Sequence, residues 1–128
     1  MSIHKESKAV DVARAHVEAW SNHDFEAARK HLAAKVHVTV TTTQQIMKPT
    51  NTVGVDEYMQ GLTQFASAVA PGSAREIATI GDERNALLML TVQADFGAGK
   101  TMLPAARLYL IDEDDKIEKE QVIFFAAI

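Results

Sequence analysis

The spacing of the apolar residues changes abruptly at Val36, and this change constrains the fold more than any other feature. Before it, residues 5–21 place apolar side chains three and four positions apart, as an amphipathic helix does. From 36 to 41 the sequence Val-His-Val-Thr-Val-Thr alternates at every second residue and is largely β-branched, which is typical of a strand. Helices followed by strands predict an α+β domain in which the helices cover one face of an antiparallel sheet.

Capping and breaking residues predict two further helices. Asp24 is a good N-cap for a short helix that runs to about Ala34. Asp56 is placed to cap a third helix that continues through Ala70, where Pro71-Gly72 ends it.

Strand and turn signals account for the rest of the chain. Residues 44–53 contain a proline and an asparagine and predict an irregular connection. Gly97-Ala98-Gly99 predicts a hairpin turn, because glycine adopts the positive φ that such turns need. Strands are expected at 75–80, 86–96, 101–111 and 117–127, so the predicted order of elements is α-α-β-α-β-β-β-β.

Composition narrows the class of protein. The 128 residues predict a single domain, 1–128, with ordinary globular usage of 47% hydrophobic and 23% charged residues. A formal net charge of −4 with scattered basic residues argues against a nucleic-acid partner. The sequence contains no run of 18 apolar residues, so no membrane span is predicted. Residues 1–8 do not resemble a signal peptide. The absence of cysteine excludes thiol chemistry and fits a cytoplasmic location.

Several local sequences together resemble one known superfamily. They are Ala-Arg-Ala-His-Val-Glu-Ala-Trp at 13–20, Asp24-Phe25, Leu32-Ala33, Gly54 before the third helix, and the segment 96–116. The chain resembles the nuclear-transport-factor-2-like superfamily from about Val10 to Phe125, and within it the ketosteroid-isomerase and SnoaL-type polyketide-cyclase branch. This resemblance implies a cystatin-like cone, in which a curved sheet wraps over the first helices and its open end leads to a pocket. It also implies a homodimer.

The catalytic residues of ketosteroid isomerases do not carry over to this sequence. Such an enzyme uses a carboxylate base on the first strand, together with a tyrosine and a protonated acid that hold the oxyanion. The matching positions here are Val40 for the base, His16 for the tyrosine and Arg107 for the acid. Because valine cannot accept a proton and arginine reverses the charge, the resemblance implies the fold but not steroid isomerisation.

Alternation along the strands and the helix stripes predict a mainly apolar pocket lining, the usual profile of a small-molecule site. Whether this lining surrounds an open pocket or packs as a filled core stays open. The residues expected to face it, besides the polar candidates His16 and Arg107, are Trp20, Val36, Val38, Val40, Tyr58, Leu62, Leu90, Val92, Ala94, Leu103, Ala105, Tyr109, Glu120, Val122 and Phe124.

Two of these polar residues have alternative interpretations. His16 is either a neutral core histidine with satisfied hydrogen bonds or a proton donor or acceptor at the pocket floor. Arg107 is either paired with Glu120, expected directly opposite across the hairpin closed by residues 112–115, or a clamp for a carboxylate or enolate of a ligand.

No metal or cofactor is expected. His4, His23, His31 and His37 lack the spacing of a helical zinc site. The acidic residues 112–115 lack the spacing of a calcium loop and predict a solvated turn.

The outer face of the sheet suggests a protein partner. Leu108, Leu110, Ile123 and Phe125 are expected to point away from the helices if Arg107 points toward them. Apolar residues on both faces of the last two strands predict a covered sheet, and a second copy of the chain is the simplest cover.

Three functions remain open at this point. The first is a pocket that binds an apolar or carboxylated metabolite. The second is a cofactor-free isomerase, lyase or cyclase that uses His16 and Arg107. The third is a non-catalytic dimerisation module with a filled core.

Overall fold

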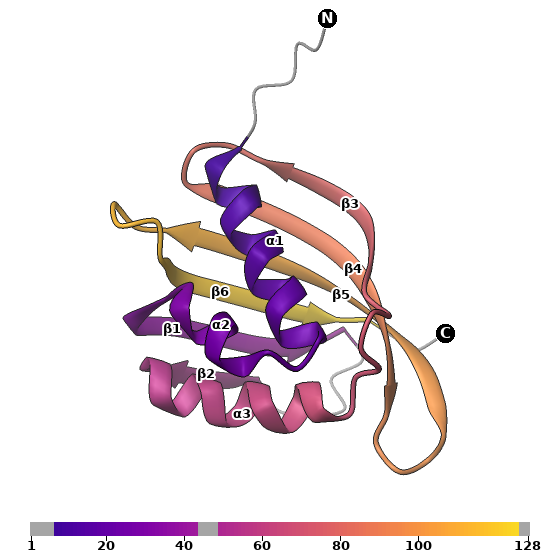
Figure 1. Cartoon of the computed structure of the whole chain (residues 1–128). Helices are drawn as coiled ribbons and strands as arrows, with labels where there is room; N and C mark the ends of the chain where they lie inside the picture. Colours follow the sequence, from indigo (N-terminus) through magenta and orange to yellow (C-terminus); the bar gives the residue numbers. More distant parts are fainter. Residues whose placement is uncertain (1–6, 44–48, 126–128) are drawn as a thin grey trace, which may run out of the picture.

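A computed structural model describes residues 7–43 and 49–125. Three helices and one six-stranded sheet make up the fold, and the helices lie on one face of the curved sheet (Figure 1). The elements are α1 (Lys8–Ser21), α2 (Phe25–Lys30), β1 (Leu32–Thr42), β2 (Thr50–Val53), α3 (Val55–Ser67), β3 (Arg75–Gly81), β4 (Asn85–Asp95), β5 (Lys100–Ile111) and β6 (Ile117–Phe124). This arrangement confirms the α+β prediction.

The sheet has the strand order β2-β1-β6-β5-β4-β3. All neighbouring strands are antiparallel except β1 and β6, which run parallel and therefore differ from the purely antiparallel sheet expected. Parallel neighbours need a long crossover, and the chain between β1 and β6 provides one. As a result β6 lies inside the sheet between β1 and β5, with both of its edges hydrogen-bonded.

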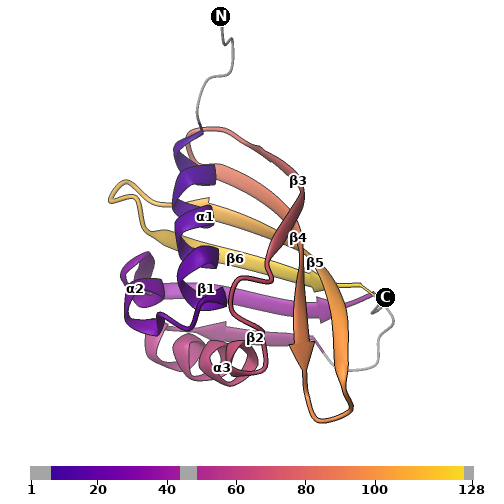
Figure 2. The same ribbon diagram turned by 45° about the vertical axis from the view of Figure 1, so that its right-hand side comes forward.

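The helices divide the concave face between them. Helix α1 packs on β3, β4 and β5, whereas α3 packs on β1 and β2. Figure 2 shows the long β4–β5 hairpin bending toward the end of α3. Phe96, which follows β4, reaches Phe65 of α3 with 5.9 Å between the ring centroids. The space enclosed by α3, β1, β6 and this hairpin holds the candidate site.

The first helix forms as its apolar spacing predicts. Its stripe of small and large apolar residues is buried against the sheet, and Trp20 is fully buried at its end. The side chain of Ser7 accepts a hydrogen bond from the backbone N–H of Val10 and caps the helix. Asp24 caps α2 as predicted, because its carboxylate accepts from the N–H of Ala27 at 3.2 Å.

Two predicted boundaries are wrong because strand pairing overrides local propensity. Helix α2 ends at Lys30 rather than Ala34, since Leu32 already pairs with Ile117 of β6. Thr50–Val53 is not irregular but forms strand β2, with Thr52 opposite Val38. Residues 44–48 of that predicted connection lie outside the described residues, as do 126–127 of the last predicted strand.

Helix α3 also ends earlier than predicted. It stops at Ser67, and Val69 then forms an isolated bridge with Ala94 of β4. The N–H of Ala70 donates to the carbonyl of Gln93 at 2.8 Å. The last turn of the predicted helix is therefore exchanged for hydrogen bonds to the sheet.

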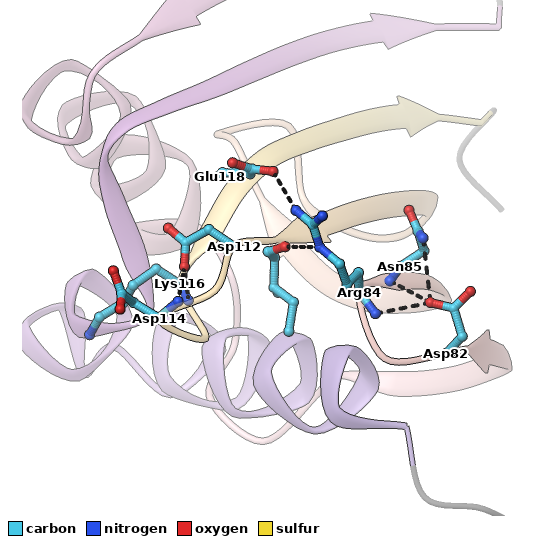
Figure 3. Close-up of polar contacts among 8 residues, drawn as sticks. Asp82, Arg84, Asn85, Asp112, Asp114, Lys116 and Glu118 are labelled. Carbon is cyan, nitrogen blue, oxygen red and sulfur yellow. Dashed lines mark hydrogen bonds and ion pairs between the residues drawn. The ribbon is translucent and has the colours of Figure 1, made fainter.

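Carboxylates organise the turns at the ends of β4 and β5 that lie away from Phe96 (Figure 3). Asp112 accepts from the N–H groups of Asp114 at 2.8 Å and Lys116 at 3.0 Å. Arg84 lies beside this turn and bonds Glu118 of β6 at 3.2 Å. The acidic run is thus a capped turn, in agreement with the solvated turn expected.

No helix in residues 7–43 or 49–125 combines the length and apolar character needed to cross a membrane.

Candidate functional site

A cavity of about 790 Å³ lies between α3 and the concave face of the sheet. Most of its wall is apolar and comes from β1, β6 and α3, while threonines of β2 and the end of β1 form part of its rim. The lining residues are Val38, Val40, Thr42, Thr50, Thr52, Glu57, Tyr58, Gly61, Leu62, Gln64, Phe65, Phe96, Leu103, Arg107, Glu120, Val122, Phe124 and Phe125.

A buried ion pair forms part of this lining. Nη1 of Arg107 lies 3.5 Å from Oε2 of Glu120, and the two side chains are only 4% and 1% exposed. Arg107 of β5 is directly opposite Val122 of β6, whereas Glu120 is opposite Tyr109. The pair is therefore diagonal rather than directly opposite as predicted. Ile111 pairs with Ile117 rather than Lys116, and the register shifts by one more residue between Leu110 and Ile111.

Aromatic rings surround the guanidinium. Its central carbon lies 4.8 Å from the ring centroid of Trp20, 5.8 Å from that of Phe124 and 6.0 Å from that of Phe65. Ring faces attract cations, so these contacts offset part of the loss of hydration. Burial opposes the charge, but the nearby oxygens of Tyr109 and Glu120 prevail and raise the pKa of Arg107 above its ordinary value. Arg107 therefore stays a cation.

Tyr58 connects the ion pair to His16. Its hydroxyl donates to Oε1 of Glu120 at 2.5 Å and lies 3.3 Å from Nε2 of His16. Nδ1 of His16 is 3.0 Å from the carbonyl oxygen of Ala28. A carbonyl only accepts, so Nδ1 carries the proton and Nε2 is left with a lone pair facing Tyr58.

Burial keeps these two groups neutral. It lowers the pKa of His16 to about 4, so the imidazole is uncharged at neutral pH. Burial also raises the pKa of the Tyr58 hydroxyl well above its ordinary value, and the nearby Glu120 carboxylate acts in the same direction. The charges at this end of the cavity therefore reside on Arg107 and Glu120.

Five buried side-chain nitrogen or oxygen atoms in the described part of the chain lack a hydrogen-bond partner. Two belong to the ion pair: Nε of Arg107, a donor, and Oε2 of Glu120, an acceptor. The contact of Oε2 with Arg107 is an ion pair without hydrogen-bond geometry. The other three are Trp20 Nε1, Thr42 Oγ1 and Tyr109 Oη. An unpaired buried polar group costs about 1–3 kcal/mol, so this end of the cavity has unused hydrogen-bonding capacity.

The structure brings only part of the predicted set to the cavity. Val38, Val40, Tyr58, Leu62, Arg107, Glu120, Val122 and Phe124 line it, as does Leu103. Eight predicted residues are buried but lie outside the lining: His16, Trp20, Val36, Leu90, Val92, Ala94, Ala105 and Tyr109. His16 contacts the lining residue Tyr58, and Trp20 contacts the lining residues Arg107 and Phe65.

Other lining residues were missed or misplaced. Phe125 was expected on the outer face but lines the cavity, because β6 ends at Phe124 and strict alternation ends with it. Thr50 and Thr52 were missed because their segment was interpreted as irregular. Phe65 had a usable signal, since it shares the inward stripe of α3 with Tyr58 and Leu62. Glu57, Gly61, Gln64 and Phe96 carried no comparable signal.

Three further hollows among the described residues are lined by no buried ion pair. One of about 230 Å³ between α1 and β3 is lined by Arg14 and Glu76, which bond each other at 2.7 Å near the surface. Among the described residues, no three histidine, aspartate or glutamate side chains come together in a group that could hold a metal ion.

A family model for the SnoaL-like domain matches residues 13–120. The chain belongs to the SnoaL-like domain family. This confirms the resemblance seen in the sequence and accounts for the curved sheet over N-terminal helices. A search of curated proteins found no match to this SnoaL-like chain.

Solved structures share the fold of this SnoaL-like protein. A protein from Kribbella flavida has a TM-score of 0.75 at 22% identity, covering 93% of this chain and 88% of its own. A candidate ketosteroid isomerase from the same organism has a TM-score of 0.72 at 11% identity, covering 94% and 80%. An epoxide hydrolase from Mycobacterium tuberculosis, described as LEH-like, has a TM-score of 0.68 at 14% identity, covering 91% and 82%. At these identities the likeness concerns the fold alone.

Proposed function

We propose that this SnoaL-like protein binds a small, largely apolar molecule in the 790 Å³ cavity, with the polar group of that molecule at Arg107 and Glu120. The observation that carries the proposal is the combination of an apolar wall with a buried ion pair in the lining, two of whose atoms lack partners. The apolar or carboxylated metabolite expected from the sequence belongs to this class of ligand.

The size of the cavity favours a ligand site over a filled core. Pockets for drug-sized molecules span about 300–1,000 Å³, are mostly apolar and carry a few converging polar groups. A core packed to ordinary density leaves few voids larger than a water molecule. The 790 Å³ cavity has the size of such a ligand pocket and is far larger than the voids of a packed core.

A binding assay with a neutral apolar dye tests the proposal. Nile red is expected to bind the wild-type protein saturably and with one-to-one stoichiometry, as measured by its fluorescence. Val40→Phe places a larger side chain in the cavity wall and is expected to weaken binding by at least about tenfold. Thr41→Phe is the matched control, because residue 41 points to the opposite face of the same strand. No saturable binding by the wild type, or equal binding by both variants, contradicts the proposal.

A second candidate is cofactor-free proton transfer, and the Tyr58 bridge favours it. A ligand ketone whose oxygen faces Arg107 could lose an α-proton to Glu120, and the C–H electron pair would move to the ketone oxygen as an enolate. Tyr58 positions the carboxylate with its hydrogen bond, and His16 in turn contacts Tyr58. His16 does not line the cavity, so in this reaction it is a positioning residue rather than the proton donor or acceptor expected.

Isotope exchange distinguishes this enzyme from a simple binding protein. The acetyl protons of 4-acetylbiphenyl, followed by NMR in deuterated buffer, are expected to exchange faster with the wild type than in buffer alone. Glu120→Gln should abolish the acceleration, and Glu118→Gln, the same change two residues away on β6, should preserve it. If the ketone binds but its acetyl protons exchange no faster than in buffer, the proton-transfer candidate is contradicted and the binding function remains.

A further inference from the structure

We infer that the polar group of the ligand is a hydroxyl, which donates to Glu120 and accepts from Arg107, on an apolar and partly aromatic skeleton. This rests on the proposed binding function and narrows the ligand class. It follows from two properties of the lining: the balance of its charges, and the donor and acceptor left without partners.

The charges of the lining disfavour an anion. Among the residues that the structure describes, Arg107 is the one cation of the lining, and Glu120 already neutralises it at 3.5 Å. Glu57 also lines the cavity, at its exposed side, so lining carboxylates outnumber lining cations by two to one. A ligand carboxylate would enter with a charge that no lining group compensates, and burying an uncompensated charge is strongly unfavourable.

The hydrogen-bond inventory selects among neutral groups. Nε of Arg107 is an unpaired donor and Oε2 of Glu120 is an unpaired acceptor, and both side chains are almost fully buried. Oε1 of Glu120 is already served by Tyr58, so that oxygen does not compete for the ligand. A hydroxyl has one donor and two acceptor lone pairs and therefore satisfies both atoms at once.

Other oxygen groups satisfy fewer of these atoms. A ketone accepts from Arg107 but has no proton for Glu120, so the carboxylate oxygen stays unpaired. A carboxylate has the same deficit and adds repulsion from Glu120. A site with an unpaired buried polar group discriminates strongly between ligands that do and do not supply the missing partner.

The skeleton follows from the wall. The ring centroid of Phe65 lies 5.9 Å from that of Phe96 and 5.5 Å from that of Phe124. All three line the cavity beside Leu62 and Leu103. Aromatic ligands gain from offset and edge-to-face contacts with such rings, which favours a planar or partly planar skeleton.

Three probes with one skeleton and different polar groups test the inference. They are 1-(biphenyl-4-yl)ethanol, 4-acetylbiphenyl and biphenyl-4-carboxylate, and each is titrated at pH 7 against bound Nile red. The alcohol is expected to bind at least about tenfold more tightly than the ketone, the effect of one hydrogen bond to a charged group. The carboxylate is expected to bind more weakly than the ketone.

Variants of Glu120 test whether this residue sets the preference. In Glu120→Gln the amide can donate to a ketone, so the advantage of the alcohol should fall below about threefold. The carboxylate should gain affinity, because Arg107 is then free of its counter-charge. Glu118→Gln makes the same change at the residue that bonds Arg84 (Figure 3) and should preserve the wild-type ranking. The ranking on wild-type protein decides the inference even if Glu120→Gln does not fold.

The outcomes separate the two levels of the proposal. If neither Nile red nor any probe binds, the proposed function fails and the inference fails with it. If the probes bind but the ketone or the carboxylate equals the alcohol, only the hydroxyl inference fails; a water molecule that permanently serves Arg107 and Glu120 would give this result. If the alcohol leads by tenfold but Glu120→Gln keeps that lead, Glu120 is not the acceptor and the inference is overturned.

Discussion

Replacing both members of the buried ion pair tests whether the pair serves the site or the fold. The double variant Arg107→Met/Glu120→Leu removes both charges and fills much of the same volume with apolar atoms. We expect its free energy of unfolding to lie within about 1 kcal/mol of the wild type, since apolar replacements of buried ion pairs are often neutral or stabilising. Tyr58 keeps an acceptor in the double variant, because Nε2 of His16 lies 3.3 Å from its hydroxyl.

The single variants should behave very differently. Removing one partner of a buried pair costs about 3–5 kcal/mol, because the other charge is left uncompensated. In Glu120→Leu the rings of Trp20 and Phe124, at 4.8 and 5.8 Å, still face the guanidinium. Such contacts are worth about 1–2 kcal/mol, so we expect a loss of about 2–4 kcal/mol. In Arg107→Met the carboxylate keeps only Tyr58, and we expect about 3–5 kcal/mol.

Urea unfolding measures all four proteins. Circular dichroism and the fluorescence of Trp20, the only tryptophan, provide two probes whose agreement tests two-state behaviour. The coupling energy from the cycle should be large, and the stable double variant should have lost the preference for a hydroxyl-bearing probe. A double variant destabilised by the sum of the two single losses would refute the reasoning, because the pair would then hold the fold together.

Three further predictions concern pH, packing and assembly. Burial lowers the pKa of His16 from 6.5 to about 4, so between these two pH values the unfolded state binds more protons than the folded state. The free energy of unfolding should therefore be highest above about pH 6.5 and should fall as the pH drops toward 4. His16→Gln should flatten this pH dependence, measured by urea titrations at several pH values. Gly81→Ala should destabilise the protein by about 1–3 kcal/mol, because the added Cβ would lie 2.6 Å from a methyl carbon of Val10. Gly61→Ala is the control, because a Cβ at this position meets no atom within 4 Å. Thermal unfolding should show a loss of stability for the first variant and none for the second. Leu108 is 40% exposed on the outer sheet face, and the homodimer predicted from the sequence should dissociate in Leu108→Glu when mass is measured by light scattering.

The architecture was predictable where local pattern and final environment agree. The alternation at 36–41 and along β4 and β5 reports which side chains face the helices, and those at Val36, Val38, Leu88 and Leu90 are indeed buried. It failed at residues 32–35 and 50–53, where the strand depends on a partner: Leu32 pairs with Ile117 of β6, and 50–53 pair with 37–40 of β1. Pairing with β6 and β1 supplies the energy there, and no local pattern contains that information.

The site was less predictable than the burial. The alternation of side chains along a strand shows which residues face the inner side of the sheet. It does not show which of those residues border the cavity and which pack elsewhere in the core. Val122 and Val92 both have the inward parity and 2% exposure, yet only Val122 lines the cavity. The difference depends on where α1 and α3 press on the sheet, and that is a property of the assembled layers.

The hairpin register explains why this polar end can receive a ligand. Directly opposite residues of an antiparallel pair hold their Cβ atoms about 4.5–5.5 Å apart, and diagonal residues about 7–8 Å. A directly opposite Arg107 and Glu120 could close into a two-bonded pair that uses both carboxylate oxygens. Two one-residue offsets make them diagonal instead, because Ile111 pairs with Ile117 rather than Lys116 and the register shifts again between Leu110 and Ile111. The pair has one 3.5 Å contact and an unpaired atom on each residue. The offsets that the sequence did not predict therefore leave an unpaired donor and an unpaired acceptor on two residues that line the cavity.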